Sequence, residues 1–282
     1  MTSWGVRHPP RAEGKTFLVT GGNAGIGYFT AEQLAGSGAT VLLGSRNAAK
    51  AAAAMTSIRS RVPDTSLGHL RLDLSDLASL KSSVDTLEIE RLDAVVCNAG
   101  VLLENQPRRE TADGHELTFA TNHLGHFVLV HHLMPLLEAA EAGRVVTTGS
   151  FVGKSAKLDL DDLQSKRDYQ PKRAAGSTAL SVVNHPGGAL DSLTPPRPVH
   201  AAPSGRKFPA GLLLHGKEAG AWPAVRAVLD PDVRGGEMFG PRVFGLRGEP
   251  RLEPVRGKLA DTALAARLWA ASVGLIGVEV TR

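Results

Sequence analysis

The feature that most constrains this chain is a glycine-rich turn, Thr20-Gly-Gly-Asn-Ala-Gly-Ile-Gly27, which lies between a strand-like and a helix-like segment. Residues 15–20 are rich in β-forming side chains, and residues 28–35 have the apolar spacing of a helix. The three glycines at 21, 25 and 27 let the backbone turn tightly, approach a pyrophosphate and pack a helix against a sheet. The N–H groups that open the helix favour an anion. The turn therefore predicts a dinucleotide site, and a glycine-rich turn without a ligand is the simpler alternative.

The first half of the chain continues the alternation of strands and helices. We predict strands at 39–46, 68–74, 92–100 and 143–150, and helices at 48–61, 76–90 and 117–140. Units of this kind form right-handed crossovers on a parallel sheet that helices cover on both faces. The predicted fold class is therefore α/β, a Rossmann-type doubly wound parallel sheet in a single domain spanning residues 1–282.

The pattern weakens after residue 150. We expect a short helix within 158–168, a brief strand at 180–184, a helix at 212–228, a short strand at 237–240 and a C-terminal helix at 259–271. Residues 186–209 are rich in Pro and Gly, which is typical of a loop. We interpret 188–210 as a loop that covers the substrate.

Composition disfavours several classes of protein. The 32 Lys and Arg against 28 Asp and Glu give a net charge of only +4, and they are scattered along the chain, which argues against nucleic-acid binding. Cys97 is the single cysteine, so no intramolecular disulfide can form, as in a reducing compartment. No apolar run is close to the length of about 18 residues that a membrane-spanning helix needs. We expect a cytoplasmic protein with neither a membrane nor a nucleic-acid partner.

Four histidines raise the question of a metal site. They lie on or near the predicted helix at 117–140, at His123, His126, His131 and His132. No acidic or cysteine partner completes a ligand set at a known spacing, so we predict no metal.

Seven short segments together suggest a family. They are Thr20-Gly-Gly-Asn-Ala-Gly-Ile-Gly27, Asp73-Leu74, Cys97-Asn-Ala-Gly100, Asn122-His-Leu-Gly-His-Phe127, Arg144-Val-Val-Thr-Thr-Gly-Ser150, Asp162-Leu-Gln-Ser165 and His185-Pro-Gly187. In this order, over nearly the whole chain, they resemble the short-chain dehydrogenase/reductase family and, within it, the retinol-dehydrogenase-like branch. The resemblance implies a nicotinamide cofactor and a small organic carbonyl or alcohol substrate.

The residues after the second strand bear on which cofactor is implied. Ser45 and Arg46 offer a hydroxyl and a guanidinium suited to a 2′-phosphate, where NAD-specific members of the family place a carboxylate. The resemblance therefore favours NADP(H), and an arginine exposed at a strand end is the alternative reading.

By the same resemblance Asp73 and Leu74 would line the adenine, and residues 98–100 would lie under the ribose, with residues 186 and 187 beside the nicotinamide. Asp191 stands where family members often have a Thr. The implied cofactor-binding residues are Thr20, Gly21, Asn23, Gly25, Ile26, Gly27, Ser45, Arg46, Asp73, Leu74, Asn98, Ala99, Gly100, Pro186 and Gly187.

The implied catalytic residues are only partly present. In the family a Tyr transfers the proton, a Lys four residues later lowers its pKa, a Ser bonds the substrate oxygen and an Asn holds a water. Ser150 and Asn122 match the Ser and the Asn. In an ungapped register the Tyr position falls on Ala175 and the Lys position on Ala179. A second alignment removes both residues by deletion, with the same consequence.

No other tyrosine replaces the missing one convincingly. Tyr169 and Arg173 have the required spacing, but Pro171 between them disfavours an established helix. The chain also passes from Ala179 almost directly to His185, where the family has further helix and strand. We therefore expect the helix between the fifth and sixth strands to be shortened or rearranged, and a homo-oligomer with a non-standard interface to cover the exposed apolar surface.

Three functional hypotheses remain open. The first is an NADP(H)-binding protein whose redox step is lost or weakened and which performs non-redox chemistry such as a cyclisation or dehydration. The second is an active NADPH-dependent oxidoreductase that uses Ser150 and Asn122 with water, or an acid such as Asp191. The third is a non-catalytic regulatory or scaffold protein that binds the cofactor.

Overall fold

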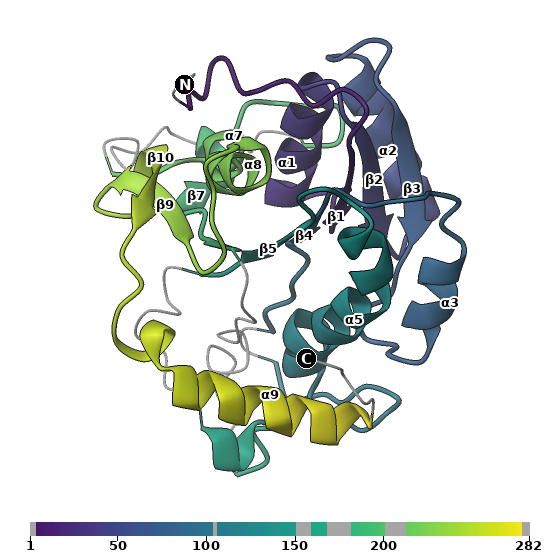
Figure 1. Ribbon diagram of the computed structural model, residues 1–282, viewed down its shortest axis with the longest axis vertical. Helices are drawn as coiled ribbons and strands as arrows, with labels where there is room; N and C mark the ends of the chain where they lie inside the picture. Colours follow the sequence, from purple (N-terminus) through teal and green to yellow (C-terminus); the bar gives the residue numbers. More distant parts are fainter. Residues whose placement is uncertain (1–3, 104–105, 151–158, 168–181, 201–212, 278–282) are drawn as a thin grey trace.

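The structure is a computed structural model that describes residues 4–103, 106–150, 159–167, 182–200 and 213–277 (Figure 1). Its centre is an eight-stranded sheet of order β10-β9-β6-β5-β4-β1-β2-β3. The strands are β1 (Thr16–Thr20), β2 (Thr40–Ser45), β3 (Leu67–Arg71), β4 (Ala94–Cys97), β5 (Arg144–Thr148), β6 (Val182–Asn184), β9 (Met238–Val243) and β10 (Arg247–Glu253). A separate parallel pair joins β7 (Ala189–Leu190) to β8 (His215–Gly216).

The pairing confirms the predicted doubly wound sheet. Every neighbouring pair from β3 to β9 is parallel, and only β10 runs antiparallel, against β9. The strand order reverses between β1 and β4, because the chain crosses from β3 back to the other side of β1. Open α/β sheets bind their ligands at the carboxyl ends of the strands beside such a reversal. The glycine-rich turn follows β1 at this point.

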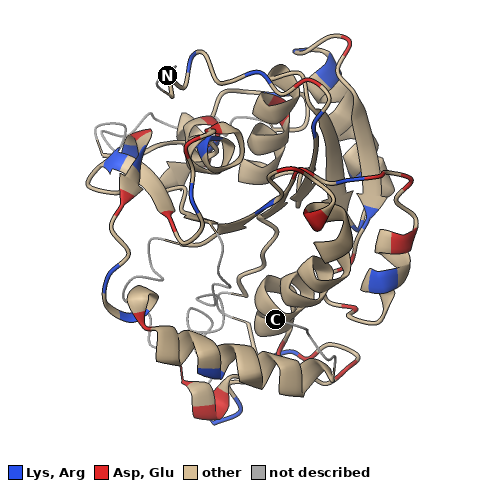
Figure 2. Cartoon of the chain, in the orientation of Figure 1, with Lys and Arg blue, Asp and Glu red and all other residues tan. Residues whose placement is uncertain are grey.

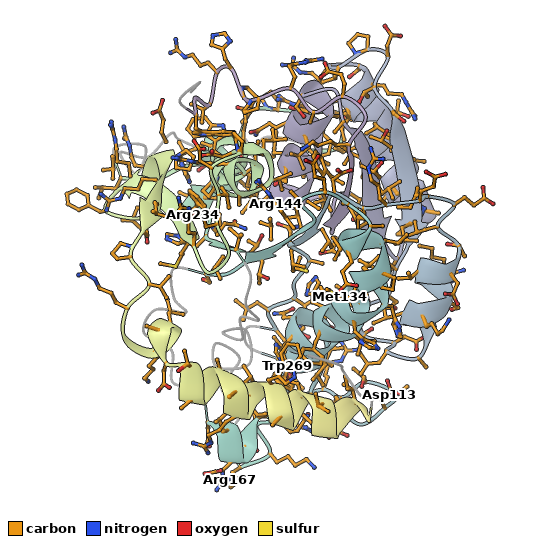
Figure 3. All side chains as sticks on the ribbon, viewed as in Figure 1. Asp113, Met134, Arg144, Arg167, Arg234 and Trp269 are labelled. Atoms are coloured by element: carbon orange, nitrogen blue, oxygen red, sulfur yellow. The ribbon has the colours of Figure 1, made fainter. Side chains whose placement is uncertain are left out.

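The helices form a layer on each face of the sheet (Figure 1). Their bounds are α1 (Gly25–Gly36), α2 (Ala48–Arg59), α3 (Ser79–Asp85), α4 (Leu117–Phe119), α5 (Gly125–Glu138), α7 (Lys217–Gly220), α8 (Trp222–Leu229) and α9 (Thr262–Ile276). The core on one face joins the sheet to α1, α2 and α8, and the core on the other face joins it to α3 and α5. The helix α9 lies along the outside of α5, where Trp269 packs edge-on against Phe127 with ring centroids 4.7 Å apart (Figure 3).

Strand β1 shows why the sheet is covered on both sides. Phe17 and Val19 belong to the core with α1, whereas Leu18 between them belongs to the core with α5. All three are at most 1% exposed, so the alternation of a strand places apolar side chains in both cores. A continuous apolar run is what a strand buried on both faces requires.

The second half departs from the predicted elements in several places. The helix expected at 212–228 is two helices, α7 and α8, and Pro223 occupies the first turn of α8. The loop expected at 188–210 contains β7 and a 3₁₀ turn at Asp191–Leu193 in its described part. Strand β10 was not expected from the sequence. The helix expected at 76–90 is shorter, since α3 ends at Asp85.

Between Ser150 and β6 the structure describes residues 159–167, where the short helix expected within 158–168 is a 3₁₀ turn at Leu160–Asp162. The rest of that segment, with the shortened or rearranged helix expected there and with Tyr169, Ala175 and Ala179, lies outside the described ranges. Lys and Arg residues and Asp and Glu residues are interspersed over the elements that are described (Figure 2). In those same ranges no helix is both long enough and apolar enough to cross a bilayer.

Candidate functional site

A cavity of about 510 Å³ lies at the carboxyl ends of β1, β2 and β4. All but three of the fifteen cofactor-binding residues expected from the sequence line it. They are Thr20, Gly21, Asn23, Gly25, Ile26, Ser45, Arg46, Asp73, Leu74, Asn98, Ala99 and Gly100. The structure therefore brings together residues from four separate parts of the chain, at the place where the strand order reverses.

The glycines of the turn have the conformations that the sequence predicts. Gly21 and Gly25 have φ values of +68° and +57°, in the left-handed region that side chains disfavour. A Cβ at Gly27 would lie 2.4 Å from Asn98 Nδ2 and 2.5 Å from the Gly21 carbonyl oxygen. Gly27 therefore does not line the cavity but allows α1 to pack closely against the strand ends.

The start of α1 is suited to an anion. Its N-cap residue, Ala24, provides no side-chain hydrogen bond, and a Cβ at Gly25 would have nothing within 4 Å among the described residues. Ala24, Gly25 and Ile26 all line the cavity. Free N–H groups and the positive end of a helix dipole thus meet open space, which fits the phosphates of a dinucleotide.

The hydroxyl of Thr20 joins β1 to the loop after β4. Its Oγ1 accepts hydrogen bonds from the backbone N–H groups of Asn98 and Ala99, each at 2.9 Å. It also lies 2.9 Å from His126 Nε2 and 3.2 Å from the Val96 carbonyl oxygen. The Asn98 side chain closes this arrangement by donating from Nδ2 to the Thr20 carbonyl at 3.0 Å. These bonds fix the floor of the cavity.

The protonation of His126 follows from its partners. Its Nδ1 lies 3.0 Å from the carbonyl oxygen of Asn122, which can only accept, so Nδ1 carries the proton. Burial lowers the pKa of His126 to about 4, so the ring is neutral and Nε2 accepts from the Thr20 hydroxyl. The ring therefore links the floor of the cavity to the backbone of Asn122.

Asn122 lies within a π-helical turn, Ala120–Leu124, that interrupts the helix expected at 117–140. Such turns are often found at functional sites. Its side-chain amide makes a reciprocal pair with the backbone of Val101, accepting from its N–H at 2.8 Å and donating to its carbonyl at 2.9 Å. Asn122 therefore holds the loop after β4 in place, and the water-holding role that resemblance implies stays a prediction.

The residues expected at the 2′-phosphate have different surroundings. Ser45 is 8% exposed, and its hydroxyl donates to the Asn47 carbonyl at 3.4 Å and lies 3.3 Å from His69 Nε2. The side chain of Arg46 is 64% exposed and lies 3.9 Å from Asp73 Oδ1. Asp73 Oδ1 accepts from the N–H and the hydroxyl of Ser75. Arg46 is therefore the more exposed of the two side chains, and its role toward a 2′-phosphate stays a prediction.

Three expected site residues follow strands β5 and β6 without lining the cavity. Ser150 follows the carboxyl end of β5 and is exposed. The Pro186 carbonyl lies 2.7 Å from His215 Nε2. Gly187 has a φ of +69°, and a Cβ added there would lie 2.5 Å from the Leu246 carbonyl oxygen. Their roles toward a nicotinamide and a substrate remain predictions.

Six lining residues were not expected from the sequence. They are Ala24, Gly44, Leu72, Val101, Thr121 and Lys217. The first five are immediate neighbours of expected residues, so extending each motif by one position would have found them. Lys217 begins α7 and follows no motif of the glycine-rich turn or of the strand ends.

Tyr28 and His123, which lie near the site, make hydrogen bonds within the fold rather than facing the cavity. Tyr28 is fully buried, its hydroxyl donates to Glu32 Oε2 at 3.0 Å, and burial raises its pKa to about 12. His123 Nε2 lies 2.7 Å from Ser272 Oγ. Within the described ranges no three His, Cys, Asp or Glu side chains gather as metal ligands.

Comparison with known proteins agrees with this geometry. Residues 15–159 match the short chain dehydrogenase family. Mouse retinol dehydrogenase 14 is 31% identical over 304 residues, which cover 96% of this chain and 88% of the relative. Mouse polyprenol dehydrogenase is 33% identical over 294 residues, which cover 95% of this chain and 85% of the relative.

Solved structures extend the similarity to the fold. A crystal structure of an uncharacterised protein from Mycobacterium paratuberculosis matches with a TM-score of 0.75 and 28% identity, covering 100% of both chains. The NADP complex of RhlG from Pseudomonas aeruginosa matches with a TM-score of 0.51 and 29% identity over 65% of this chain and 76% of that one. The chain belongs to the short-chain dehydrogenase family of nicotinamide-dependent oxidoreductases, in its retinol-dehydrogenase-like branch.

Proposed function

We propose that this protein binds NADP(H) and acts on a small organic carbonyl or alcohol, with the usual Tyr- and Lys-dependent redox step lost or weakened. The observation that carries the proposal is the cavity at the reversal of strand order, with the uncapped start of α1 and Arg46 among its lining residues. Non-redox chemistry on the bound substrate, such as a cyclisation or dehydration, is the corresponding activity.

The preference for NADP(H) over NAD(H) rests on Arg46. A planar guanidinium pairs well with a phosphate, and the position after β2 has no carboxylate to accept from a ribose hydroxyl. The nearest carboxylate oxygen, on Asp73, is 3.9 Å from Arg46 Nη1, so the arginine is not held in a tight pair. The solved RhlG complex with NADP supports the same cofactor.

The weakened redox step rests on the sequence. A bound nicotinamide supplies or accepts a hydride, but the proton needs its own donor. In the ungapped register the family's Tyr and Lys are replaced by Ala175 and Ala179, which have neither a proton to transfer nor a charge, and in the second alignment both residues are deleted. Loss of a general acid reduces the rate by about 10²–10⁴-fold. Ser150 would still hydrogen-bond the substrate oxygen.

Cofactor titration tests the first part of the proposal. We expect NADPH to bind more tightly than NADH and to raise the melting temperature of the protein. Arg46→Ala should weaken NADPH binding by about tenfold and leave NADH binding unchanged, because only NADPH carries the 2′-phosphate. Arg11→Ala is the matched control, because both arginine side chains are 64% exposed. Equal binding of NADPH and NADH to the unaltered protein would contradict the preference.

A panel of aldehydes and ketones with NADPH tests the second part. We expect turnover far below ordinary enzymatic rates, because the proton donor is missing. Reduction at ordinary rates would refute the weakened redox step.

An active oxidoreductase is the second candidate, favoured by the similarity to retinol and polyprenol dehydrogenases over most of the chain. In that case Ser150 and water would support the reaction. Ser150→Ala should then abolish both turnover and its pH dependence, and a rate indifferent to this change would exclude the candidate.

A further inference from the structure

Lys217 lines the cavity from a part of the chain almost 200 positions away from the glycine-rich turn. It is the first residue of α7, and its side chain is only 24% exposed. Among the described residues that line the cavity, the positively charged ones are Arg46 and Lys217. Arg46 is the cation proposed for the 2′-phosphate, so Lys217 is the other positive side chain that these residues bring to the cavity.

Residues of one short turn contact both the side-chain ammonium group and the backbone N–H of Lys217. Asp191 begins the 3₁₀ turn after β7, and its carboxylate forms an ion pair with Lys217 Nζ. Thr194 follows the same turn, and its hydroxyl oxygen accepts from the Lys217 backbone N–H at 2.9 Å. The Thr194 hydroxyl donates in turn to the Leu190 carbonyl at 2.7 Å. The lysine is therefore fixed at its backbone and at its ammonium group.

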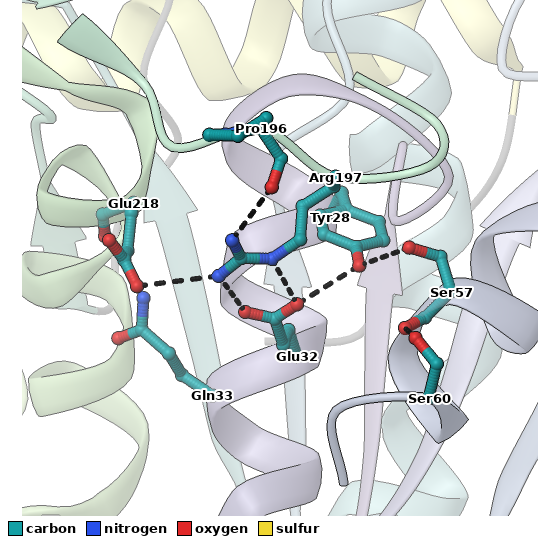
Figure 4. Close-up of polar contacts among 8 residues, drawn as sticks. All are labelled: Tyr28, Glu32, Gln33, Ser57, Ser60, Pro196, Arg197 and Glu218. Carbon is teal, nitrogen blue, oxygen red and sulfur yellow. Dashed lines mark hydrogen bonds and ion pairs between the residues drawn. The ribbon is translucent and has the colours of Figure 1, made fainter. Parts of the chain in front are cut away.

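A network of ion pairs and hydrogen bonds, with the buried pair of Arg197 and Glu32 at its centre, joins α7 to α1 (Figure 4). Arg197 binds Glu32 through two parallel hydrogen bonds, from Nε and Nη2, each at 2.8 Å. Arg197 Nη2 also lies 3.5 Å from Glu218 Oε1, next to Lys217 in α7. Gln33 of α1 donates to the Glu218 carbonyl at 2.9 Å. Since α1 begins at the cavity, these contacts help to hold α7, and with it Lys217, beside the cavity.

We propose that Lys217 binds the pyrophosphate of the dinucleotide and that Asp191 is the residue that positions its ammonium group. The helix start offers N–H groups to the phosphates, and Lys217, held by Asp191, brings an ammonium group with three N–H donors to the same cavity. A pyrophosphate carries charge in every nicotinamide dinucleotide, whereas the 2′-phosphate is confined to NADP(H). Lys217 therefore increases the affinity for NADPH and NADH alike, whereas Arg46 increases the affinity for NADPH over NADH. This inference rests on the proposed cofactor binding.

The test compares the affinities of three ligands: NADPH, NADH and adenosine 2′-monophosphate. The last has the phosphate expected near Arg46 but no pyrophosphate. Lys217→Met removes the charge and keeps a long apolar side chain. We expect it to raise the dissociation constants of NADPH and NADH by roughly tenfold each and to leave that of adenosine 2′-monophosphate unchanged. Lys217→Arg should restore most of the affinity.

Controls separate this inference from a general charge effect. Lys81→Met removes a lysine that also pairs with an aspartate, Asp85, on α3, and it should change none of the three affinities. Circular dichroism and thermal melting verify that each variant is folded. If Lys217→Met binds NADPH and NADH as tightly as the unaltered protein, Lys217 does not bind the pyrophosphate, and the proposed function stands. If the unaltered protein binds neither dinucleotide, both the inference and the proposed function are overturned.

Discussion

The pair between Arg197 and Glu32 offers a quantitative test of how this structure is held together. Their side chains are 6% and 9% exposed, and the guanidinium meets the carboxylate through two bonds of 2.8 Å. The Tyr28 hydroxyl donates to the same carboxylate at 3.0 Å. Arg197→Met fills most of the same volume but leaves the Glu32 charge buried with a phenol and no cation.

Breaking a buried pair by removing one partner costs about 3–5 kcal/mol, because the remaining charge has lost both its counter-ion and its water. A domain of this kind has about 5–15 kcal/mol of stability in total. The expected loss is therefore a large fraction of the free energy of unfolding. In the double variant Glu32→Gln with Arg197→Met no unpaired charge remains, so most of that loss should be recovered.

Urea unfolding followed by circular dichroism measures these free energies. Arg11→Met is the control, because Arg11 pairs with Glu13 at the surface, where both side chains are more than half exposed. Exposed pairs contribute about 0–1 kcal/mol. If Arg197→Met costs no more than Arg11→Met, or if the double variant is less stable than Arg197→Met alone, the argument from a buried charge is wrong.

Two further predictions concern α1 and α9. Gly27→Ala should abolish dinucleotide binding in a fluorescence titration, because the added Cβ would lie 2.4 Å from Asn98 Nδ2, whereas Gly36→Ala in the same helix, with nothing within 4 Å, should bind normally. Equal binding by both variants would contradict the close packing of the turn. Burial, and then the neighbouring His126, lower the pKa of His123 to about 4, against 6.5 for the free side chain. The unfolded chain therefore binds the extra proton, and stability should fall as the pH falls from about 6.5 toward about 4. If the free energy of unfolding is measured across that pH range, His123→Phe should reduce its slope against pH by the equivalent of about one proton. An unchanged slope would exclude His123 as the source of the dependence.

The first half of the fold was predictable because its strands are buried on both faces. All four residues of β4 are buried, and all residues of β1 except the first, which is half-buried, are buried as well. Such strands appear as apolar runs, separated by helices at a regular pace. The glycine turn was equally clear, since Gly21 and Gly25 need the positive φ values that they have. Local chemistry therefore determined both the sheet and most of the cavity.

Strand β10 shows why the sheet edge was missed. Its sequence, Arg-Gly-Glu-Pro-Arg-Leu-Glu, is mostly polar, and only Pro250 and Glu253 are buried. An edge strand needs no continuous apolar run, because one side faces solvent. Glu253 is buried by pairing with His185, 3.1 Å away at the carboxyl end of β6. Neither residue indicates this partnership by itself, since they are separated by 68 positions.

The same argument explains why the sequence indicated a site role for Arg46 but not the contacts of Lys217 and Arg197. Arg46 ends a predicted strand, so its place at the cavity can be inferred from the local sequence. Arg197 has its partner Glu32 165 positions away, and Lys217 is held by Asp191 and Thr194, more than 20 positions before it. A charged residue within a Pro- and Gly-rich stretch is usually exposed. The burial of such a residue depends on a partner that the local sequence does not specify. A sequence motif therefore cannot predict residues such as Lys217 and Arg197, whose positions depend on contacts with distant parts of the chain.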